Sequence, residues 1–223
     1  MRGFTPLQSG AALIPVALGM ALMAPRSSGL AERFGAKAVC ATGFGLIALS
    51  FLGIQLLDQT SPVWLLVVVL SVQGLGMGAV MAPATESIMS VVPREKAGAG
   101  AAVNNSVRQD GGALGVAILG SVLAASYAAH LEPAVHALPA GMQESASQSI
   151  VATAEAIRQV EAGGDEDAAR AAAALAAPAR EAFVSAMHVT AVFTAGAAVV
   201  AAVVVLVWLP GRRRQDDTRS ARS

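Results

Sequence analysis

Five apolar stretches separated by loops of alternating charge most constrain what this chain of 223 residues folds into. Each stretch is close to the roughly 20 residues that an α-helix needs to cross a hydrocarbon core about 30 Å thick. Because hydrocarbon offers the backbone no hydrogen-bond partners, a spanning segment must satisfy its own N–H and C=O groups as a helix. The pattern therefore predicts an all-α, polytopic membrane protein with five transmembrane helices. The stretches are residues 7–25, 36–57, 63–82, 98–125 and 187–209.

Lys and Arg side chains fall in alternate loops, and this alternation predicts the orientation of the chain. Basic loops stay on the cytoplasmic side of a membrane. The basic residues of the first and third loops are Arg26, Arg33, Lys37, Arg94 and Lys96. Residues 211–223 after the last stretch add five arginines, whereas the second and fourth loops are acidic or contain few bases. We therefore expect a multi-pass protein of the cell (plasma) membrane with a cytoplasmic C-terminus and an extracytoplasmic Met1.

Four segments follow from these stretches and loops. Residues 1–126 are predicted to contain four transmembrane helices, with a cytoplasmic loop at 26–37 between the first two. Residues 127–181 form an Ala-rich, acidic extracytoplasmic segment that we expect to be helical, because alanine has the highest helix propensity. The last transmembrane helix is expected within 182–210, and residues 211–223 form a basic cytoplasmic tail.

Composition excludes several classes of function. Hydrophobic residues make up 55% of the chain and charged residues 13%, whereas soluble domains carry about 25% charged residues. No basic patch with interleaved aromatic residues supports binding of nucleic acid. The single cysteine, Cys40, excludes a cysteine metal cluster, and the glycine-rich run at 74–78 lacks the Lys-Ser/Thr of a phosphate-binding loop. We expect no enzymatic activity, no cofactor and no metal.

The loop at residues 26–37 carries a pattern of charges around a glycine. Gly35 permits a tight reversal of the backbone. Glu32 is expected to complement the start of the following helix, where carboxylates are favoured. Arg33 and Lys37 are expected to hold the loop on the cytoplasmic side and to pair with acids of neighbouring helices. The alternative is that these charges only set the topology.

This loop resembles a motif of the major facilitator superfamily, which reads Gly-x-Leu-Ala-Asp-Arg-x-Gly-Arg-Lys. The resemblance implies that the loop acts as a cytoplasmic latch, with Glu32 and Arg33 as its charge partners. The chain departs from the motif at Ser28, Glu32 and Ala36. It matches the motif at Leu30, Ala31, Arg33, Gly35 and Lys37.

The fourth stretch contains a charge near mid-membrane. Arg108 lies about ten residues from the cytoplasmic end of the stretch, which is roughly 15 Å deep and close to the midplane. Such a charge is costly in lipid, so it is expected to face the bundle interior, a partner or a water-filled cavity. Arg108 is therefore either a structural tether, for example to Glu86, or a residue of the transport path, and these roles are compatible. Glu86 is either a solvated interfacial carboxylate or an embedded group that carries protons.

Small residues in two stretches predict close helix packing. The spacing of Gly74 and Gly78 places both on one helical face, where small residues let two backbones approach. In the fourth stretch, Asn104 and Arg108 share a face with three glycines. Those glycines are Gly111, Gly112 and Gly115.

Three sequence motifs between residues 83 and 115 resemble the drug:proton antiporter branch with fourteen helices, the EmrB/QacA type. They read Pro-Ala-Thr-acid-Ser, Pro-x-Glu-Lys-Ala-Gly and Asn-x-x-x-Arg-x-x-Gly-Gly-Ala-x-Gly, in this order. The resemblance implies efflux of hydrophobic or cationic small molecules in exchange for protons. Asn105 stands where an Asp is frequent, and Asp110 where the branch usually has an apolar residue. The candidate residues for substrate binding or coupling are Glu86, Asn104, Asn105, Arg108 and Asp110.

By helix count, this resemblance implies an incomplete C-terminal bundle. The expected function is a part of a proton-coupled multidrug carrier that is inactive alone, because the N-terminal helices are missing. One alternative is a stand-alone membrane interaction protein that pairs with a separate half-carrier. Another is a non-functional gene remnant.

Overall fold

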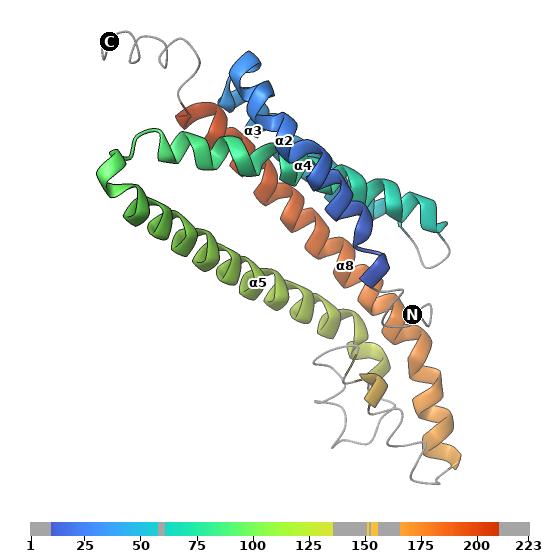
Figure 1. Ribbon diagram of the computed structural model, residues 1–223. Coiled ribbons are helices and arrows are strands. Elements are labelled where there is room, and N and C mark those ends of the chain that lie inside the picture. Colours follow the sequence, from blue (N-terminus) through green and yellow to red (C-terminus); the bar gives the residue numbers. More distant parts are fainter. Residues whose placement is uncertain (1–9, 58–60, 136–150, 152, 156–165, 210–223) are drawn as a thin grey trace. The chain divides into compact units, whose positions relative to one another are not determined.

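The computed structural model describes residues 10–57, 61–135, 151, 153–155 and 166–209 (Figure 1). Within these residues the regular elements are helices, as the all-α prediction requires. Two 3₁₀ turns, Ile54–Leu56 and Arg94–Lys96, follow α3 and precede α5. The long helices are α2 (Ile14–Phe34), α3 (Ala36–Gly53), α4 (Val63–Met89), α5 (Ala97–Val135) and α8 (Glu166–Trp208).

Four helices of the described chain are long and apolar enough to cross a membrane. They correspond to the last four predicted spans and cover Ala36–Leu56, Val63–Met89, Arg94–Leu131 and Ala176–Trp208. The first predicted span, residues 7–25, lies in the part of the chain that contains α2, and its residues 7–9 lie outside the described residues. α2 is not among these four helices, so its crossing of the membrane stays a prediction.

Two of the helices are much longer than the predicted spans. α5 has 39 residues and α8 has 43, which at 1.5 Å per residue is about 58 and 64 Å. Much of the segment predicted as 127–181 therefore belongs to the ends of these helices. The rest of that segment, except 151 and 153–155, and the predicted basic tail at 211–223 lie outside the described residues.

The chain divides into two compact units, whose boundaries fall inside α5 and α8. One unit contains Arg2–Ala113 and Val192–Ser223, and the other contains Leu114–Ala191. In the second unit, the hydroxyls of Tyr127 and Thr153 are 2.7 Å apart and buried. This hydrogen bond ties the far end of α5 to the residues that follow it.

In the first unit, α4 lies between α2 and α3 and packs against α2 through glycines (Figure 1). A Cβ atom built on Gly74 would overlap the backbone of Val16. One built on Gly78 would lie 2.9 Å from the carbonyl oxygen of Met20. Small residues at these two positions allow the backbones of α2 and α4 to touch, which is how helices gain packing energy in lipid.

The opposite face of α4 packs against α3. Gly76 lies two residues after Gly74 and therefore about 200° around the helix. A Cβ atom there would lie 2.7 Å from the carbonyl oxygen of Gly43 in α3. Near the end of α3 and the start of α4, the buried hydroxyl of Ser50 donates a 2.9 Å hydrogen bond to the carbonyl oxygen of Val69. α4 thus has two glycine faces, and it is the centre of a three-helix core.

Candidate functional site

The stretch predicted as a loop at residues 26–37 is almost entirely helical. α2 continues to Phe34 and α3 begins at Ala36, so the connection is reduced to Gly35. The polar residues do not interrupt α2, because the hydroxyl of Ser27 donates a 2.8 Å hydrogen bond to the carbonyl oxygen of Ala24 in its own helix. The predicted short loop is therefore helical except at Gly35, where the predicted reversal is present.

Gly35 has φ 89° and ψ 141°, a backbone conformation that residues with a Cβ atom rarely adopt. Its N–H donates a 2.8 Å hydrogen bond to the carbonyl oxygen of Ala31, which closes the last turn of α2. The glycine of the motif is thus required by the sharp junction of the two helices.

Replacing Gly35 with alanine is expected to lower the free energy of unfolding by about 1–3 kcal/mol, the usual cost of a residue held in a sparsely populated conformation. Gly29 in α2 is the matched control, since a Cβ atom there meets nothing within 4 Å. Gly29→Ala is expected to stabilise the helix by about 0.5–1 kcal/mol. Denaturation of both variants in detergent micelles measures the difference, and equal effects would contradict the role of Gly35.

The charges of this motif lie at the end of α2. Arg33 is in its last turn, where a cation interacts favourably with the helix dipole. The guanidinium carbon of Arg33 lies 5.5 Å from the centroid of the Phe34 ring, within the range of a cation–π contact. Glu32 is also on α2 and is exposed, and the first turn of α3 has no side-chain cap. The expectation that Glu32 caps α3 was therefore wrong, because α2 extends past it.

The second polar segment is the end of α4, around Pro83. Pro83 is buried inside the helix and lacks the N–H that would bond to the previous turn. The hydroxyls of Thr85 and Ser87 donate hydrogen bonds of 2.9 and 2.7 Å to the carbonyl oxygens of Met81 and Pro83. Back-bonding of this kind often accompanies bending of a helix. Glu86 follows on the exposed surface, near the end of α4.

Arg108 lies on α5, in the part that belongs to the same unit as α4. It is 11 residues after Ala97, the first residue of the helix, and so about 17 Å along it. Its Nη2 donates a 3.1 Å hydrogen bond to Oδ1 of Asn105, and its Nη1 lies 4.0 Å from the sulfur of Met81. Among the described residues these contacts, rather than one to Glu86, hold the guanidinium. Nothing in the sequence motif pointed to Met81.

The five candidate residues do not form one cluster. Asn104, Asn105 and Arg108 lie on one face of α5, because they are three and four residues apart. Asp110 is two residues from Arg108 and therefore about 200° around the helix. Glu86 is five residues from Met81, about 140° around α4 and 7.5 Å further along it. The structure thus brings the amides and the arginine together and leaves the two carboxylates apart from them.

The glycines of α5 differ from those of α4. A Cβ atom at Gly111, Gly112 or Gly115 would meet nothing within 4 Å. Among the described residues these glycines therefore have no close packing partner, unlike Gly74 and Gly78. Their role in helix packing stays a prediction.

Membrane-length helices that pack through glycines and carry a charged side chain well inside one of them are features of membrane transport proteins. The chain belongs to the major facilitator superfamily, whose family model matches residues 2–140. The match includes α2, α3, α4 and α5, and therefore both polar segments described above.

Several bacterial proteins are similar to this chain. The riboflavin transporter RibZ of Clostridioides difficile is 34% identical over 126 residues, which are 56% of this chain and 28% of RibZ. The tetracenomycin C resistance and export protein of Streptomyces glaucescens is 34% identical over 124 residues, 56% of this chain and 23% of that protein. The methyl viologen resistance protein SmvA of Salmonella typhimurium is 29% identical over 143 residues, 64% of this chain and 28% of SmvA. The matched region spans about a quarter of the length of these curated relatives.

Proposed function

We propose that this chain is part of a proton-coupled multidrug efflux carrier of the fourteen-helix drug:proton antiporter branch. The observation that carries the proposal is Arg108, held by Asn105 and Met81 about 17 Å along a membrane-length helix. A charge at this depth is costly unless it lines a bundle interior or a watery path. The names of two relatives, an export protein and a methyl viologen resistance protein, support efflux as the direction of transport.

The proposed mechanism is alternating access, in which two helix bundles rock about a site near the midplane. This chain supplies part of one bundle, and the polar face of α5 with Asn104, Asn105 and Arg108 faces the transport path. A hydrophobic or cationic compound leaves as protons enter. Glu86 and Asp110, the carboxylates of α4 and α5, are the candidates for proton coupling, and they lie apart from this polar face.

The remaining wall of the path comes from helices outside these 223 residues. Support for this part of the proposal is that the matched region spans only about a quarter of the relatives. This part of the proposal also rests on the exposure of polar residues on α5, which further helices would cover. These residues are Asn105, Arg108 and Asp110. In the first candidate, we propose that these further helices belong to the same polypeptide. The exposure of α5 on more than one side also favours a second candidate, in which this chain pairs with a separate half-carrier.

We propose the orientation in which the turn between α4 and α5 and the C-terminus are cytoplasmic. Arg94 and Lys96 lie in that turn, between two helices of membrane length. Basic residues beside the ends of membrane spans favour the cytoplasmic side. The latch motif around Gly35 then lies on the same side of the membrane, since α3 and α4 each cross once.

Transport of the fluorescent cation ethidium by everted vesicles that contain the carrier tests the proton coupling. In these vesicles the cytoplasmic face points outward, so an exporter moves ethidium into the vesicle. An imposed pH gradient, acidic inside, is expected to drive ethidium into the vesicles. Nigericin, which exchanges K⁺ for H⁺ and dissipates the pH gradient, is expected to stop uptake. Uptake at an unchanged rate after the gradient has collapsed would contradict proton coupling.

A further inference from the structure

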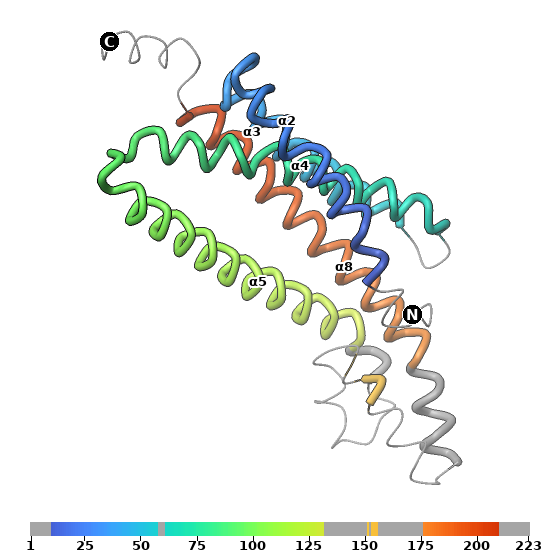
Figure 2. Tube along the Cα trace, in the orientation of Figure 1, coloured from blue at the N-terminus to red at the C-terminus, as the bar shows by residue number. Residues whose placement is uncertain are grey.

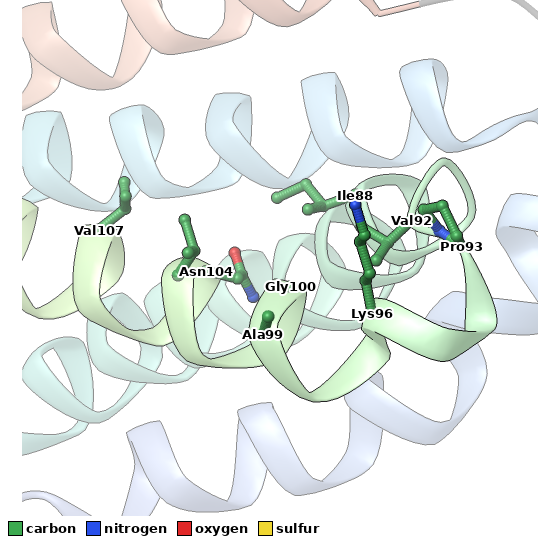
Figure 3. Close-up of a pocket in the computed structure, with 9 residues that line it drawn as sticks. Ile88, Val92, Pro93, Lys96, Ala99, Gly100, Asn104 and Val107 are labelled. Atoms are coloured by element: carbon green, nitrogen blue, oxygen red, sulfur yellow. The ribbon is translucent and has the colours of Figure 1, made fainter.

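An apolar crevice lies where α4 ends and α5 begins. Its volume is about 440 Å³. Ile88 and Val92 line it on the side of α4, and Asn104 and Val107 line it on the side of α5 (Figure 3). Val103 of α5 is also a lining residue. Asn104 thus borders both the crevice and the polar face proposed for the transport path. Lys96 also lines the crevice, and its side chain extends from the start of α5 toward Ile88. All these residues belong to one compact unit.

The turn between the two helices shapes this crevice. The chain reverses direction there (Figure 2), and the N–H of Lys96 donates a 2.9 Å hydrogen bond to the carbonyl oxygen of Pro93. A Cβ atom on Gly100 would lie 2.8 Å from a methyl carbon of Val92. α5 therefore starts in close contact with the turn.

The crevice combines a basic entrance with an apolar interior. Arg94, Glu95 and Lys96 are exposed in the turn between two membrane-length helices, where a membrane interface is expected. The two bases exceed the one carboxylate, so the turn keeps a net positive charge. From Lys96 to Val107 the helix rises about 17 Å, close to half of a hydrocarbon core about 30 Å thick. The crevice thus runs from the interface to about mid-membrane, the depth of one lipid leaflet.

We propose that this crevice binds an anionic phospholipid, with the acyl chain along Val103 and Val107 and the phosphate beside Lys96. Basic pockets between helices on the cytoplasmic side bind anionic headgroups, and this is the side proposed for the turn. A hydrophobic cation would meet the positive charge of Lys96. The charge therefore favours an anionic lipid over a hydrophobic cation, and the test below distinguishes a lipid from a second copy of this chain.

Native mass spectrometry of the 223-residue chain in detergent, with added phosphatidylglycerol or phosphatidylcholine, tests the proposal. The chain is expected to prefer phosphatidylglycerol. Lys96→Gln is expected to weaken phosphatidylglycerol binding about five-fold, the ratio given by about 1 kcal/mol per basic residue near an anionic surface. Arg26→Gln is the matched control, because Arg26 is exposed on α2 and bonds to Leu22 of its own helix.

The apolar part is tested by filling the crevice. Val103→Trp is expected to abolish binding of both lipids, whereas Val116→Trp, on α5 outside the crevice, is expected to leave it unchanged. If Val103→Trp lowers thermal stability, Ala99→Phe fills the crevice from another lining position. Equal affinity for the two lipids, or equal effects of Lys96→Gln and Arg26→Gln, would overturn the proposal. So would a dimer that only Val103→Trp dissociates, because a second copy would then be the occupant.

Discussion

Substitution of Arg108 by alanine is expected to reduce export about 10- to 150-fold at unchanged amounts of carrier in the membrane. The guanidinium is held by Asn105 and Met81 rather than by an acidic side chain of the described residues, so it remains available to a substrate or to a coupling group. A hydrogen bond to a charged group contributes about 1.5–3 kcal/mol, which corresponds to the stated range. Ethidium export from everted vesicles measures the effect.

Controls separate a transport role of Arg108 from a structural one. Arg108→Lys keeps the charge and is expected to retain part of the activity. Arg26→Ala removes an exposed arginine from α2 and is expected to have no effect, because Arg26 bonds only to Leu22 of its own helix among the described residues. If Arg108→Ala lowers the amount of carrier but not the rate per molecule, Arg108 is a tether. Full activity of Arg108→Ala would contradict both roles.

A valine at Gly74 is expected to destabilise the three-helix core by about 1–3 kcal/mol or more, the usual cost of adding volume to a packed interior. The added Cβ atom would overlap the backbone of Val16. Backbone atoms cannot rotate away as the end of a flexible side chain does, so α2 and α4 would have to separate. Unfolding of the purified chain in mixed micelles, titrated with dodecyl sulfate, measures the change.

Gly45 on α3 is the matched control for Gly74. It is a helical, exposed glycine at which a Cβ atom meets nothing within 4 Å. Gly45→Val places the same side chain in a membrane-length helix without a neighbouring backbone. Equal unfolding midpoints for the two variants would show that α2 does not pack on α4 through Gly74.

Part of this core could be predicted from the sequence. The four-residue spacing of Gly74 and Gly78 places them on one face, and the structure has α2 against that face. The contact between Gly76 and Gly43 could not be predicted, because it depends on which helix covers the opposite face of α4. A single sequence shows periodicity within one helix but not the pairing of faces between helices.

The ends of the helices were harder to predict than their centres. Hydropathy identifies the most apolar part of a helix. It therefore gives no end for α5 or α8, where an Ala-rich sequence continues the helix beyond that part. In the same way, the polar residues of α2 predicted a loop. Ser27 instead satisfies its hydroxyl within the helix by bonding to Ala24, and only Gly35 breaks it.

The candidate site residues were predicted from their type and their expected depth in the membrane. The structure shows on which face of its helix each one lies. The spacing of Asn104 and Arg108 correctly places them on one side of α5. The contact of Arg108 with Met81 crosses between two helices and has no signal within either one. The crevice beside Lys96 was missed for the same reason, since its two walls come from α4 and α5.

The central claim is that these 223 residues form part of one wall of a transport path and need further helices to transport. Ethidium export by everted vesicles tests it most directly, with the chain alone and with the chain joined to the N-terminal helices of a relative such as SmvA. We predict no export above protein-free vesicles for the chain alone, and gradient-driven export for the joined carrier. Export by the chain alone, abolished by Arg108→Ala, would show that it is a complete transporter and would contradict the account.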